Sequence, residues 1–526
     1  MPSKEEKYIL SIDMGTSGPK SALVSTRGEV LDFEFEPVEL ILLPNVGAEQ
    51  RPEDWWNAIL NTSKKVLGKK LVPVDDIVAV CCSTQWSGTV AIDQNGDHLM
   101  NAIIWMDSRG HPYIEEITDG LIKIEGYEVR KMMKWLKLTG GAPGHAGKDP
   151  VGHILYIKNK LPEIYQKTFK FLEPKDYINL RFTGQIASAF DSVTLHWVTD
   201  NRDIHNIVYN DSLIKLSTID KDKFPVLKHA TDVLGPIKKE VAEELGLNKD
   251  VKVVMGTPDV QCAALGSGAV RDYESHLYIG TSSWLTCHVP FKKTDIFHNM
   301  ASLPSAIPGK YFVANEQDTA GGCLNFLRDN ILYHKDELLA EAHSPDVFKI
   351  FDQIAEKVPA GSDKLIFTPW LYGERTPVES HTLRAGLYNM SLNTTREHMI
   401  RAVLEGVAYN SRWLLKYVEK FIKRKLDTIS MIGGGASSNI WCQIHADVFN
   451  RNIKQVKDPI QSNARGAAFL AAVSLGYLTF DDIPELIQVE NIYEPNPENR
   501  KIYDELFKEF LNIYKQNKAM YHRLNK

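Results

Sequence analysis

Two segments of this 526-residue chain share a pattern of groups that could bind phosphate. Residues 9–24 and 276–289 each alternate into and out of a glycine turn, formed by Gly15, Thr16 and Ser17 in the first and by Gly280, Thr281 and Ser282 in the second. This alternation predicts two β-hairpins. Glycine lets the backbone approach an anion closely, and the N–H and hydroxyl groups that follow can donate to phosphate oxygens. The repetition indicates a duplicated chain.

An aspartate accompanies each turn. Asp13 precedes the first, and Asp259 opens a small-residue helix after an apolar strand over residues 251–255 and a predicted turn over residues 256–258. A carboxylate between a strand and a helix is suited to act as a base in a cleft. An unperturbed aspartate has a pKa near ~3.9, so we expect Asp259 to be ionised at pH 7. Either residue could instead be an ordinary hydrogen-bonded turn residue.

Polar and aromatic residues follow two further predicted strands. Gln85, Trp86 and Ser87 come after the buried run 77–82, and Trp105 ends the run 101–105. Ligands of open α/β sheets bind at the carboxyl ends of the strands. These residues are therefore candidate substrate contacts, although Trp86 could equally pack in the core.

Glycine-rich turns in the second half suggest a nucleotide site. Gly321 begins a predicted helix that contains Asn325, and strand 429–432 runs through three glycines into a helix near Asn439. Helix N-termini favour phosphate groups. A long helix is predicted over 395–418, and a small-residue helix over 464–475 should pack behind the glycine turn. Residues 200–250 are predicted to be helical.

Length and composition predict a two-domain globular protein. The chain is too long for one core, its hydrophobic content is 43% and its net charge is −6. That charge argues against a chain built to bind nucleic acid or an anionic membrane. The charged N-terminus runs directly into a strand, so we expect a cytoplasmic protein without a membrane anchor. Cys442 and His445 lie one helical turn apart, and we interpret them as core residues rather than metal ligands.

Residues 8–480 resemble the FGGY carbohydrate kinases, within the larger group of actin, hexokinase and Hsp70-like ATPases. The resemblance rests on ordered motifs: the Asp13 to Lys20 turn, Trp105 with Asp107 and Arg109, residues 171–177 with Thr183 and Gly184, Gly256 with Asp259, Ala263 and Gly266, the second Gly-Thr-Ser turn, residues 373–377, Arg401-Ala402 with Glu405-Gly406, and residues 433–438 with Trp441 and Gln443. It implies an α/β fold of two RNase H-like domains around a central cleft. We expect a sugar-binding domain over residues 1–255, an ATP-binding domain over 256–485 and a helical tail over 486–526 that packs on the second domain.

The resemblance also assigns roles to the candidate residues, with ATP and Mg²⁺ as cofactors. Asp259 would be the general base that takes the proton of the attacking hydroxyl, and Asp13 and Asp259 would hold Mg²⁺ largely through water. The substrate would contact Asp259 together with Gln85, Trp86, Ser87 and Trp105. The residues expected to bind ATP and its phosphates are Gly15, Thr16, Ser17, Lys20, Gly280, Thr281, Ser282, Gly321, Asn325, Gly434, Gly435, Ala436 and Asn439.

The substrate side departs from familiar patterns. Xylulokinases show Gln-Met-His-Gly where this chain has Gln85-Trp86-Ser87-Gly88, and the Arg-Glu pair of glycerol kinases is replaced by Trp86 and Ser87, which argues against glycerol. The family's Lys-x-x-Trp helix has His153 and Tyr156 at those positions in this chain. The pattern is most like that of xylulokinases, and predicts conversion of D-xylulose to D-xylulose 5-phosphate.

Other interpretations remain open at this point. The substrate could be ribulose, a tetritol, another polyol or a deoxy sugar. An Hsp70-like ATPase switch would need an appended peptide-binding domain, whereas only a short tail follows Phe480. A sugar sensor without activity would not need the base. The expected partner is a small sugar or polyol, without nucleic acid or membrane, and assembly into a homodimer is left open.

Overall fold

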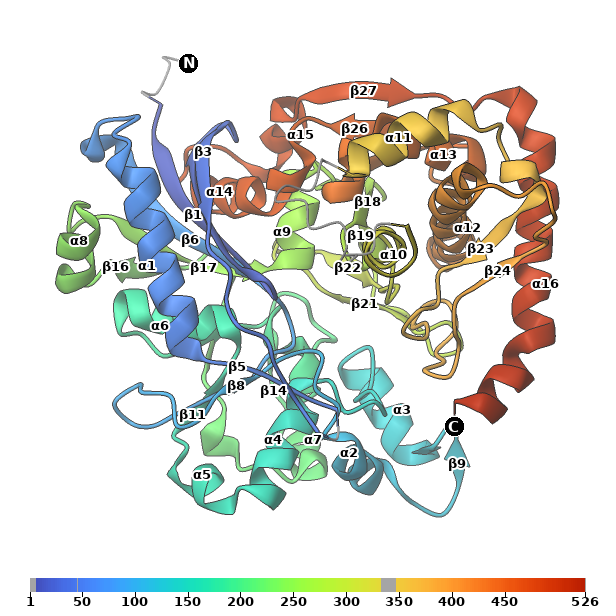
Figure 1. Ribbon diagram of the computed structural model, residues 1–526. Helices are drawn as coiled ribbons and strands as arrows, with labels where there is room; N and C mark the ends of the chain where they lie inside the picture. The colour runs from blue at the N-terminus through green and yellow to red at the C-terminus, as the bar shows by residue number, and fades with distance from the viewer. Residues whose placement is uncertain (1–5, 45, 333–346, 526) are drawn as a thin grey trace, which may run out of the picture.

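The computed structural model describes residues 6–44, 46–332 and 347–525. The chain forms two α/β halves that lie side by side, each built on a central sheet with helices packed against it (Figure 1). Among the described residues, no helix is long and apolar enough to cross a membrane.

The first half is built on a six-stranded sheet in the order β16-β17-β6-β1-β2-β3. β1 (Tyr8–Gly15), β2 (Gly18–Ser25) and β3 (Val30–Phe35) form an antiparallel meander, whereas β6 (Ile77–Thr84) and β17 (Lys252–Pro258) run parallel to β1, and β16 (Val233–Pro236) closes the edge. β1, β6 and β17 are buried and read as nearly continuous apolar runs, as expected for strands covered on both faces. Helices α1 (Pro52–Gly68) and α6 (Pro174–Thr183) pack against this sheet.

A mainly helical insertion separates β6 from β17 and fills the lower part of the first half in Figure 1. Most of its strands are two or three residues long and form small separate sheets. The remaining elements of the first half are β4 (Ile41–Leu43), β5 (Gly47–Gln50), β7 (Val90–Ile92), β8 (Ala102–Ile103), α2 (His111–Thr118), β9 (Lys123–Ile124), β10 (Tyr127–Glu128), α3 (Val129–Leu138), α4 (Pro150–Lys160), α5 (Pro162–Lys167), β11 (Lys170–Leu172), β12 (Ala187–Ala189), β13 (Thr199–Asp200), β14 (Val208–Tyr209), α7 (Asp211–Ser217), β15 (Val226–Lys228) and α8 (Lys239–Leu245).

The second half repeats the arrangement of the first in an eight-stranded sheet, β20-β21-β22-β19-β18-β25-β26-β27. β18 (Ser275–Ile279), β19 (Ser283–Val289) and β22 (Tyr311–Ala314) are antiparallel neighbours, and β25 (Thr428–Ile432) and β26 (Asn452–Val456) run parallel to β18. In each sheet the first hairpin strand therefore begins a three-stranded antiparallel meander on one side, and two parallel strands follow it on the other. The shared topology confirms the duplication and the two RNase H-like cores.

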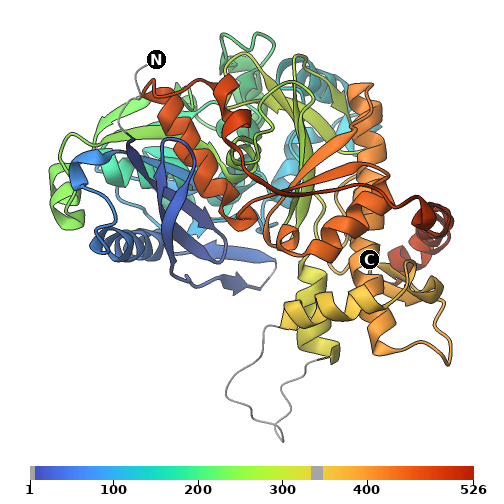
Figure 2. The ribbon, with the colours of Figure 1, turned by 90° about the horizontal axis from the view of Figure 1, so that it is seen from above.

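Helices cover both faces of the second sheet (Figures 1 and 2). The longest, α12 (Arg396–Ile422), has 18 of its 27 residues buried. α16 (Arg500–Leu524) packs along the outer edge, where the ring centroids of Phe510 and Trp370 lie 5.3 Å apart. The other elements of this half are β20 (Thr294–Asp295), β21 (Met300–Pro304), α10 (Gly322–Leu327), α11 (Val347–Lys357), β23 (Ile366–Thr368), β24 (Gly386–Tyr388), α13 (Asn439–Phe449), α15 (Ile483–Leu486) and β27 (Val489–Tyr493).

Three local expectations are wrong. The predicted turn over residues 256–258 is the end of β17, where Gly256 adopts a φ of +74° within a bulge. Residues 200–250 contain β14, β15 and β16 besides the short helices α7 and α8. The tail is not wholly helical, because β27 pairs with β26 at the sheet edge.

Two helices cross at the junction of the halves. α9 (Asp259–Gly266) follows β17, and α14 (Ser462–Ser474), from late in the chain, packs on α9 and on the first sheet (Figure 1). α14 was expected to pack behind the glycine turn of the second half, so this placement corrects the expectation. A Cβ on Gly266 would lie 1.8 Å from the Ser462 carbonyl oxygen, and one on Gly466 would lie 1.9 Å from that of Cys262. Only glycine permits this approach.

Candidate active site

Three neighbouring parallel strands end together at one edge of the first sheet. Asp13 on β1 and Thr257 on β17 are both in register with Ser83 on β6, which lies between them. Asp259 follows β17 by one residue, and Gln85 follows β6. The structure therefore brings the predicted base, the predicted Mg²⁺ carboxylates and the predicted substrate segment to one place, as expected at the carboxyl ends of parallel strands.

Asp259 is the first residue of α9. Its Oδ1 accepts a hydrogen bond from the backbone N–H of Val260 at 2.8 Å. Burial, followed by the negative charge of Asp13, raises the pKa of Asp259 to about 8. The expectation of an ordinary, ionised carboxylate is therefore wrong for the ligand-free cleft. Burial also raises the pKa of Asp13, although the Lys20 ammonium, 3.7 Å away, and the amide of Asn463 oppose this shift.

This shift predicts how pH affects the stability of the ligand-free protein. Because the pKa of Asp259 is about 8 in the folded state and near ~3.9 when unfolded, the carboxyl stabilises the fold most below the lower value. This contribution to the free energy of unfolding is lost as pH rises through the folded-state pKa of about 8. Asp259→Asn does not titrate, so its Tm should rise relative to wild type between about pH 5 and about pH 8.5. Thermal unfolding in EDTA without nucleotide measures the difference, and a Tm gap that is independent of pH would contradict it.

The first Gly-Thr-Ser turn is attached to the substrate side by hydrogen bonds. The Thr16 hydroxyl accepts from the Trp105 indole N–H at 2.9 Å and donates to Gln85 Oε1 at 3.2 Å. Gln50, at the end of β5, donates to the Thr16 carbonyl at 2.8 Å and accepts from the Gln85 amide at 2.8 Å. The Thr16 hydroxyl is thus committed within the protein, and phosphate binding at this turn would depend on its backbone, on exposed Ser17 and on Lys20.

Trp86 and Ser87 face the helical insertion. One face of the Trp86 indole packs against the core near Phe312, and its N–H donates to the Ser192 carbonyl at 2.9 Å. Ser87 adopts a φ of +64° and donates to the Lys148 carbonyl at 2.9 Å. Trp86 is therefore a partly buried core residue, as one interpretation of the sequence expected, and it lies at the edge of the candidate substrate site.

The departures at His153 and Tyr156 are structural. His153 is fully buried, shares a hydrogen bond with the Thr89 hydroxyl at 3.1 Å, and burial lowers its pKa to about 4. The Tyr156 hydroxyl accepts from Arg109, whose guanidinium lies over the Tyr156 ring. Cys442 and His445 are fully buried, and within the described residues no metal-binding group of three His, Cys, Asp or Glu side chains occurs.

The second sheet places its glycine turns together in the same way. β18 and β25 are neighbouring parallel strands with Tyr278 in register with Ile432, so the Gly280 turn lies beside the turn over residues 433–436. A Cβ on Gly321 would lie 2.5 Å from the Gly280 carbonyl oxygen, and one on Gly435 would lie 2.3 Å from Ile279 Cγ2. Glu316, a carboxylate that the sequence did not single out, has its pKa raised by burial and lowered in part by Arg375 and by the Ser282 hydroxyl. The predicted nucleotide turns thus meet at the end of β18.

The residues present fit a nucleotide. A Cβ built on Gly15 or on Gly434 meets no atom within 4 Å, so both turns border open space. Gln455 donates to the Ala436 carbonyl and to Asn439 Oδ1, at 2.8 and 3.0 Å, and thereby fixes the turn at the N-terminus of α13. Anions are stabilised near a helix N-terminus. The side chain of Asn325 lies on the first turns of α10 and is half-buried.

The turn at residues 459–460 contacts both halves, at Lys20 of the first hairpin and at Gly433 of the second half's glycine turn. Lys20 donates to the Ile460 carbonyl at 3.1 Å, and the Gly433 N–H donates to the carbonyl of Pro459 at 3.0 Å.

The carboxylates at the strand ends of the first sheet also fit Mg²⁺, because this ion is usually held by one or two carboxylates together with water and substrate phosphates. Asp13 and Asp259 would supply those carboxylates.

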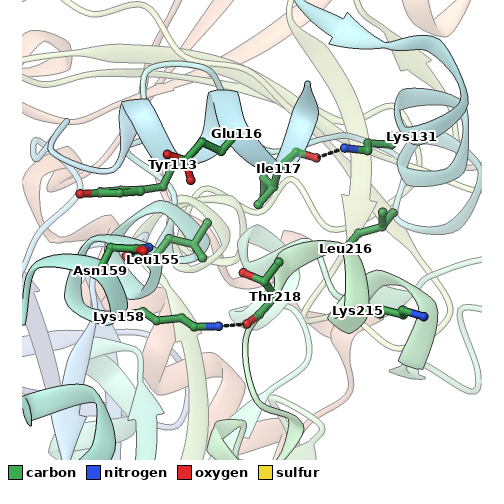
Figure 3. A pocket seen from close by; sticks show the side chains of 10 residues that line it. All are labelled: Tyr113, Glu116, Ile117, Lys131, Leu155, Lys158, Asn159, Lys215, Leu216 and Thr218. Atoms are coloured by element: carbon green, nitrogen blue, oxygen red, sulfur yellow. Dashed lines mark hydrogen bonds between the residues drawn. The ribbon is translucent and has the colours of Figure 1, made fainter. Parts of the chain in front are cut away.

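A separate hollow of about 470 Å³ lies among α2, α4 and α7 of the helical insertion (Figure 3). Lys131 and Lys158 point toward backbone carbonyls there, those of Ile117 and Thr218 respectively. These lysines therefore satisfy carbonyls in the insertion. The hollow contains none of the predicted site residues, so we do not assign it to the reaction. It is lined by Tyr113, Glu116, Ile117, Lys131, Leu155, Lys158, Asn159, Lys215, Leu216 and Thr218.

Two duplicated cores, with glycine turns at strand ends of both and two carboxylates at strand ends of the first, have the architecture of the actin and hexokinase ATPases. Comparison with known proteins makes the class specific. Residues 8–266 match the N-terminal domain of the FGGY family of carbohydrate kinases, and residues 277–475 match its C-terminal domain. The chain belongs to this family, and is a sugar-phosphorylating transferase.

Similar proteins differ in substrate. A xylulose kinase of Bacillus subtilis is 29% identical over 98% of both chains, and a gluconokinase of the same organism is 27% identical over 96% of this chain and 95% of its own. The crystal structure of ligand-bound xylulose kinase from Lactobacillus acidophilus superposes with a TM-score of 0.85 at 25% identity, covering 98% of this chain and all of that one.

Proposed function

We propose that this enzyme transfers the γ-phosphoryl group of Mg-ATP to a hydroxyl of D-xylulose, with Asp259 as the general base. The observation that carries the proposal is the shared register of β1, β6 and β17, which sets Asp13 and Asp259 on either side of the Gln85 segment. The family uses ATP as phosphate donor. The similarity to xylulose kinases over nearly the whole chain supports the choice of sugar.

In this mechanism the substrate hydroxyl lies beside Asp259, which accepts its proton as the oxygen attacks the γ-phosphorus and ADP leaves. General bases typically contribute about 10²- to 10⁴-fold. The base must be ionised, whereas the pKa of Asp259 in the ligand-free cleft is about 8. Mg²⁺ held by Asp13 and Asp259 would neutralise phosphate charge and lower that pKa. The turns at Gly15 and Gly280 would position the phosphates, which is most of what phosphoryl transfer requires.

An aldonate such as gluconate is a second candidate. The Lys148 ammonium lies 5.4 Å from the centre of the Tyr372 ring, and the part of the chain that the structure describes offers it no carboxylate within ion-pairing distance. Its backbone carbonyl is held by Ser87, beside the candidate substrate segment. Lys148 could therefore pair with a substrate carboxylate, although burial, followed by the positive charge of Arg375, lowers its pKa, and Asp318, Glu316 and Glu379 oppose that shift.

The test is sugar-stimulated ADP release from Mg-ATP across a panel of ketopentoses, polyols and aldonates. We expect D-xylulose to give the highest kcat/KM and a 5-phosphate product by mass spectrometry and NMR. Stimulation by gluconate alone, abolished in Lys148→Met, would select the second candidate. Stimulation by neither, with turnover on another sugar of the panel, would overturn both assignments of substrate and leave the class intact.

A further inference from the structure

The strand that leads to the general base is interrupted by a bulge at Gly256, three residues before Asp259. β17 pairs with β6 up to Val254, bulges at Gly256 and pairs again at Thr257. A bulged strand bends and twists locally, and bulges often re-aim a side chain beside an active site. Groups freed by the bulge need other partners, because buried backbone groups without hydrogen bonds are costly.

Buried polar side chains of the helical insertion supply those partners. The Met255 carbonyl accepts from the Lys175 ammonium at 3.1 Å and from the Asn179 amide at 2.7 Å, both from α6. Lys175 also donates to Asp176 at 2.5 Å, so its buried charge is paired. The end of β17 is therefore fixed by side chains from outside the sheet.

Asp191 makes the most direct of these contacts. The Thr257 hydroxyl donates to Asp191 Oδ2 at 2.5 Å, and both residues are fully buried. Thr257 is two residues before Asp259. A hydrogen bond to an ionised acceptor is roughly twice as strong as one between neutral groups. Burial raises the pKa of Asp191 to about 6, so it is ionised at neutral pH.

The next residue connects the same segment to the substrate side. The Ser192 carbonyl accepts the Trp86 indole N–H at 2.9 Å. The Asp191 side chain therefore holds Thr257, at the end of β17. The backbone carbonyl of Ser192 holds the Trp86 indole. The proposed base and the candidate substrate residue Trp86 are thus connected to adjacent positions of one buried segment.

We propose that Asp191 is a positioning residue, which through Thr257 sets the placement of the Asp259 carboxylate relative to Trp86 and thereby to the sugar hydroxyl. The inference rests on the proposed role of Asp259. Asp191 itself does not contact substrate. Since a misplacement of about 1 Å can cost about 10²-fold in rate, the loss of this contact should appear in kcat rather than in ATP binding.

The test compares conservative and disruptive variants of the pair on whichever panel sugar the wild type phosphorylates. Asp191→Ala and Thr257→Val remove the hydrogen bond, and each should lower kcat by about 10- to 100-fold while the KM for ATP changes by less than about twofold. Asp191→Asn and Thr257→Ser keep an acceptor and a hydroxyl, and should stay within about threefold of wild type. The double variant should be no worse than either single one, because one contact is lost in each case.

Asp447→Ala is the matched control, since Asp447 is also buried and accepts from Gln443, Asn496 and Asn499 in α13 and the segment before α16. It should lower Tm without changing kcat. The proposal is overturned if Asp191→Ala and Thr257→Val both retain wild-type kcat, or if Asp447→Ala loses as much kcat as they do. If Asp191→Ala does not fold, the Thr257→Val and Thr257→Ser pair decides alone. An active Asp259→Asn would instead show that the proposed base is wrong.

Discussion

Asp259→Asn should lower kcat for sugar phosphorylation by about 10²- to 10⁴-fold, the range expected for loss of a general base. The side-chain shape is retained, and the hydrogen bond that Asp259 accepts from the Val260 N–H can be accepted by an amide oxygen. The fold should therefore be unchanged. Because the raised pKa keeps Asp259 largely neutral in the ligand-free cleft at pH 7, a neutral amide should be accommodated beside Asp13 without new repulsion.

Coupled ADP release at saturating sugar and Mg-ATP measures this effect, with far-UV circular dichroism and thermal unfolding as checks on folding. Asp447→Asn serves as a control for the chemical change at a buried carboxylate outside the cleft. Turnover of Asp259→Asn within about tenfold of wild type would exclude a general-base role, since positioning alone would then explain the rate.

Gly466→Ala should destabilise the protein by about 3 kcal/mol or more, the upper end of the cost of overpacking. The new methyl would lie 1.9 Å from the Cys262 carbonyl oxygen, so two backbones must separate rather than one side chain rotate. α14 packs on both α9 and the first sheet, and α9 begins with Asp259. Separation of the helices should therefore lower both Tm and kcat.

Gly68→Ala is the matched control. Gly68 is the last residue of α1, and a Cβ there meets no atom within 4 Å. Alanine is favoured over glycine in helices by roughly 0.5–1 kcal/mol, so this variant should be as stable as wild type or slightly more. Differential scanning calorimetry compares the two variants. An unchanged Tm for Gly466→Ala would show that the helices do not cross as closely as described.

The hairpins and strand ends could be predicted from sequence because their signals are local. Alternation with a period of two and a glycine turn specify β1 with β2 and β18 with β19 without reference to distant residues. Asp13 and Asp259 could be selected because each lies at such a strand end. The glycine turns near residues 321 and 433 follow from the same reasoning.

The rest depends on contacts between distant segments. α14 is rich in small residues, but nothing in its sequence specifies that it packs on the first sheet rather than the second. The bulge at Gly256 is a response to pairing with β6, and β27 forms only because β26 offers an edge.

The same reason explains what sequence reasoning missed at the site. The raised pKa of Asp259 arises from burial and from Asp13, which is far away in sequence. Gln50 and Asp191 have no local motif, because their importance comes from the hydrogen bonds they make to Thr16 and Thr257. A buried polar residue is recognised only once its partners are known.

A crystal structure of the wild-type enzyme with D-xylulose, Mg²⁺ and a non-hydrolysable ATP analogue tests the central claim most directly. The account predicts a sugar hydroxyl within about 2.6–3.2 Å of the Asp259 carboxylate, the reach required of a general base. It also predicts the γ-phosphate at the turn of Gly15, Thr16 and Ser17, with the nucleotide along the turns at Gly280 and Gly434. A sugar bound away from the ends of β1, β6 and β17, with its hydroxyls out of reach of Asp259, would contradict it.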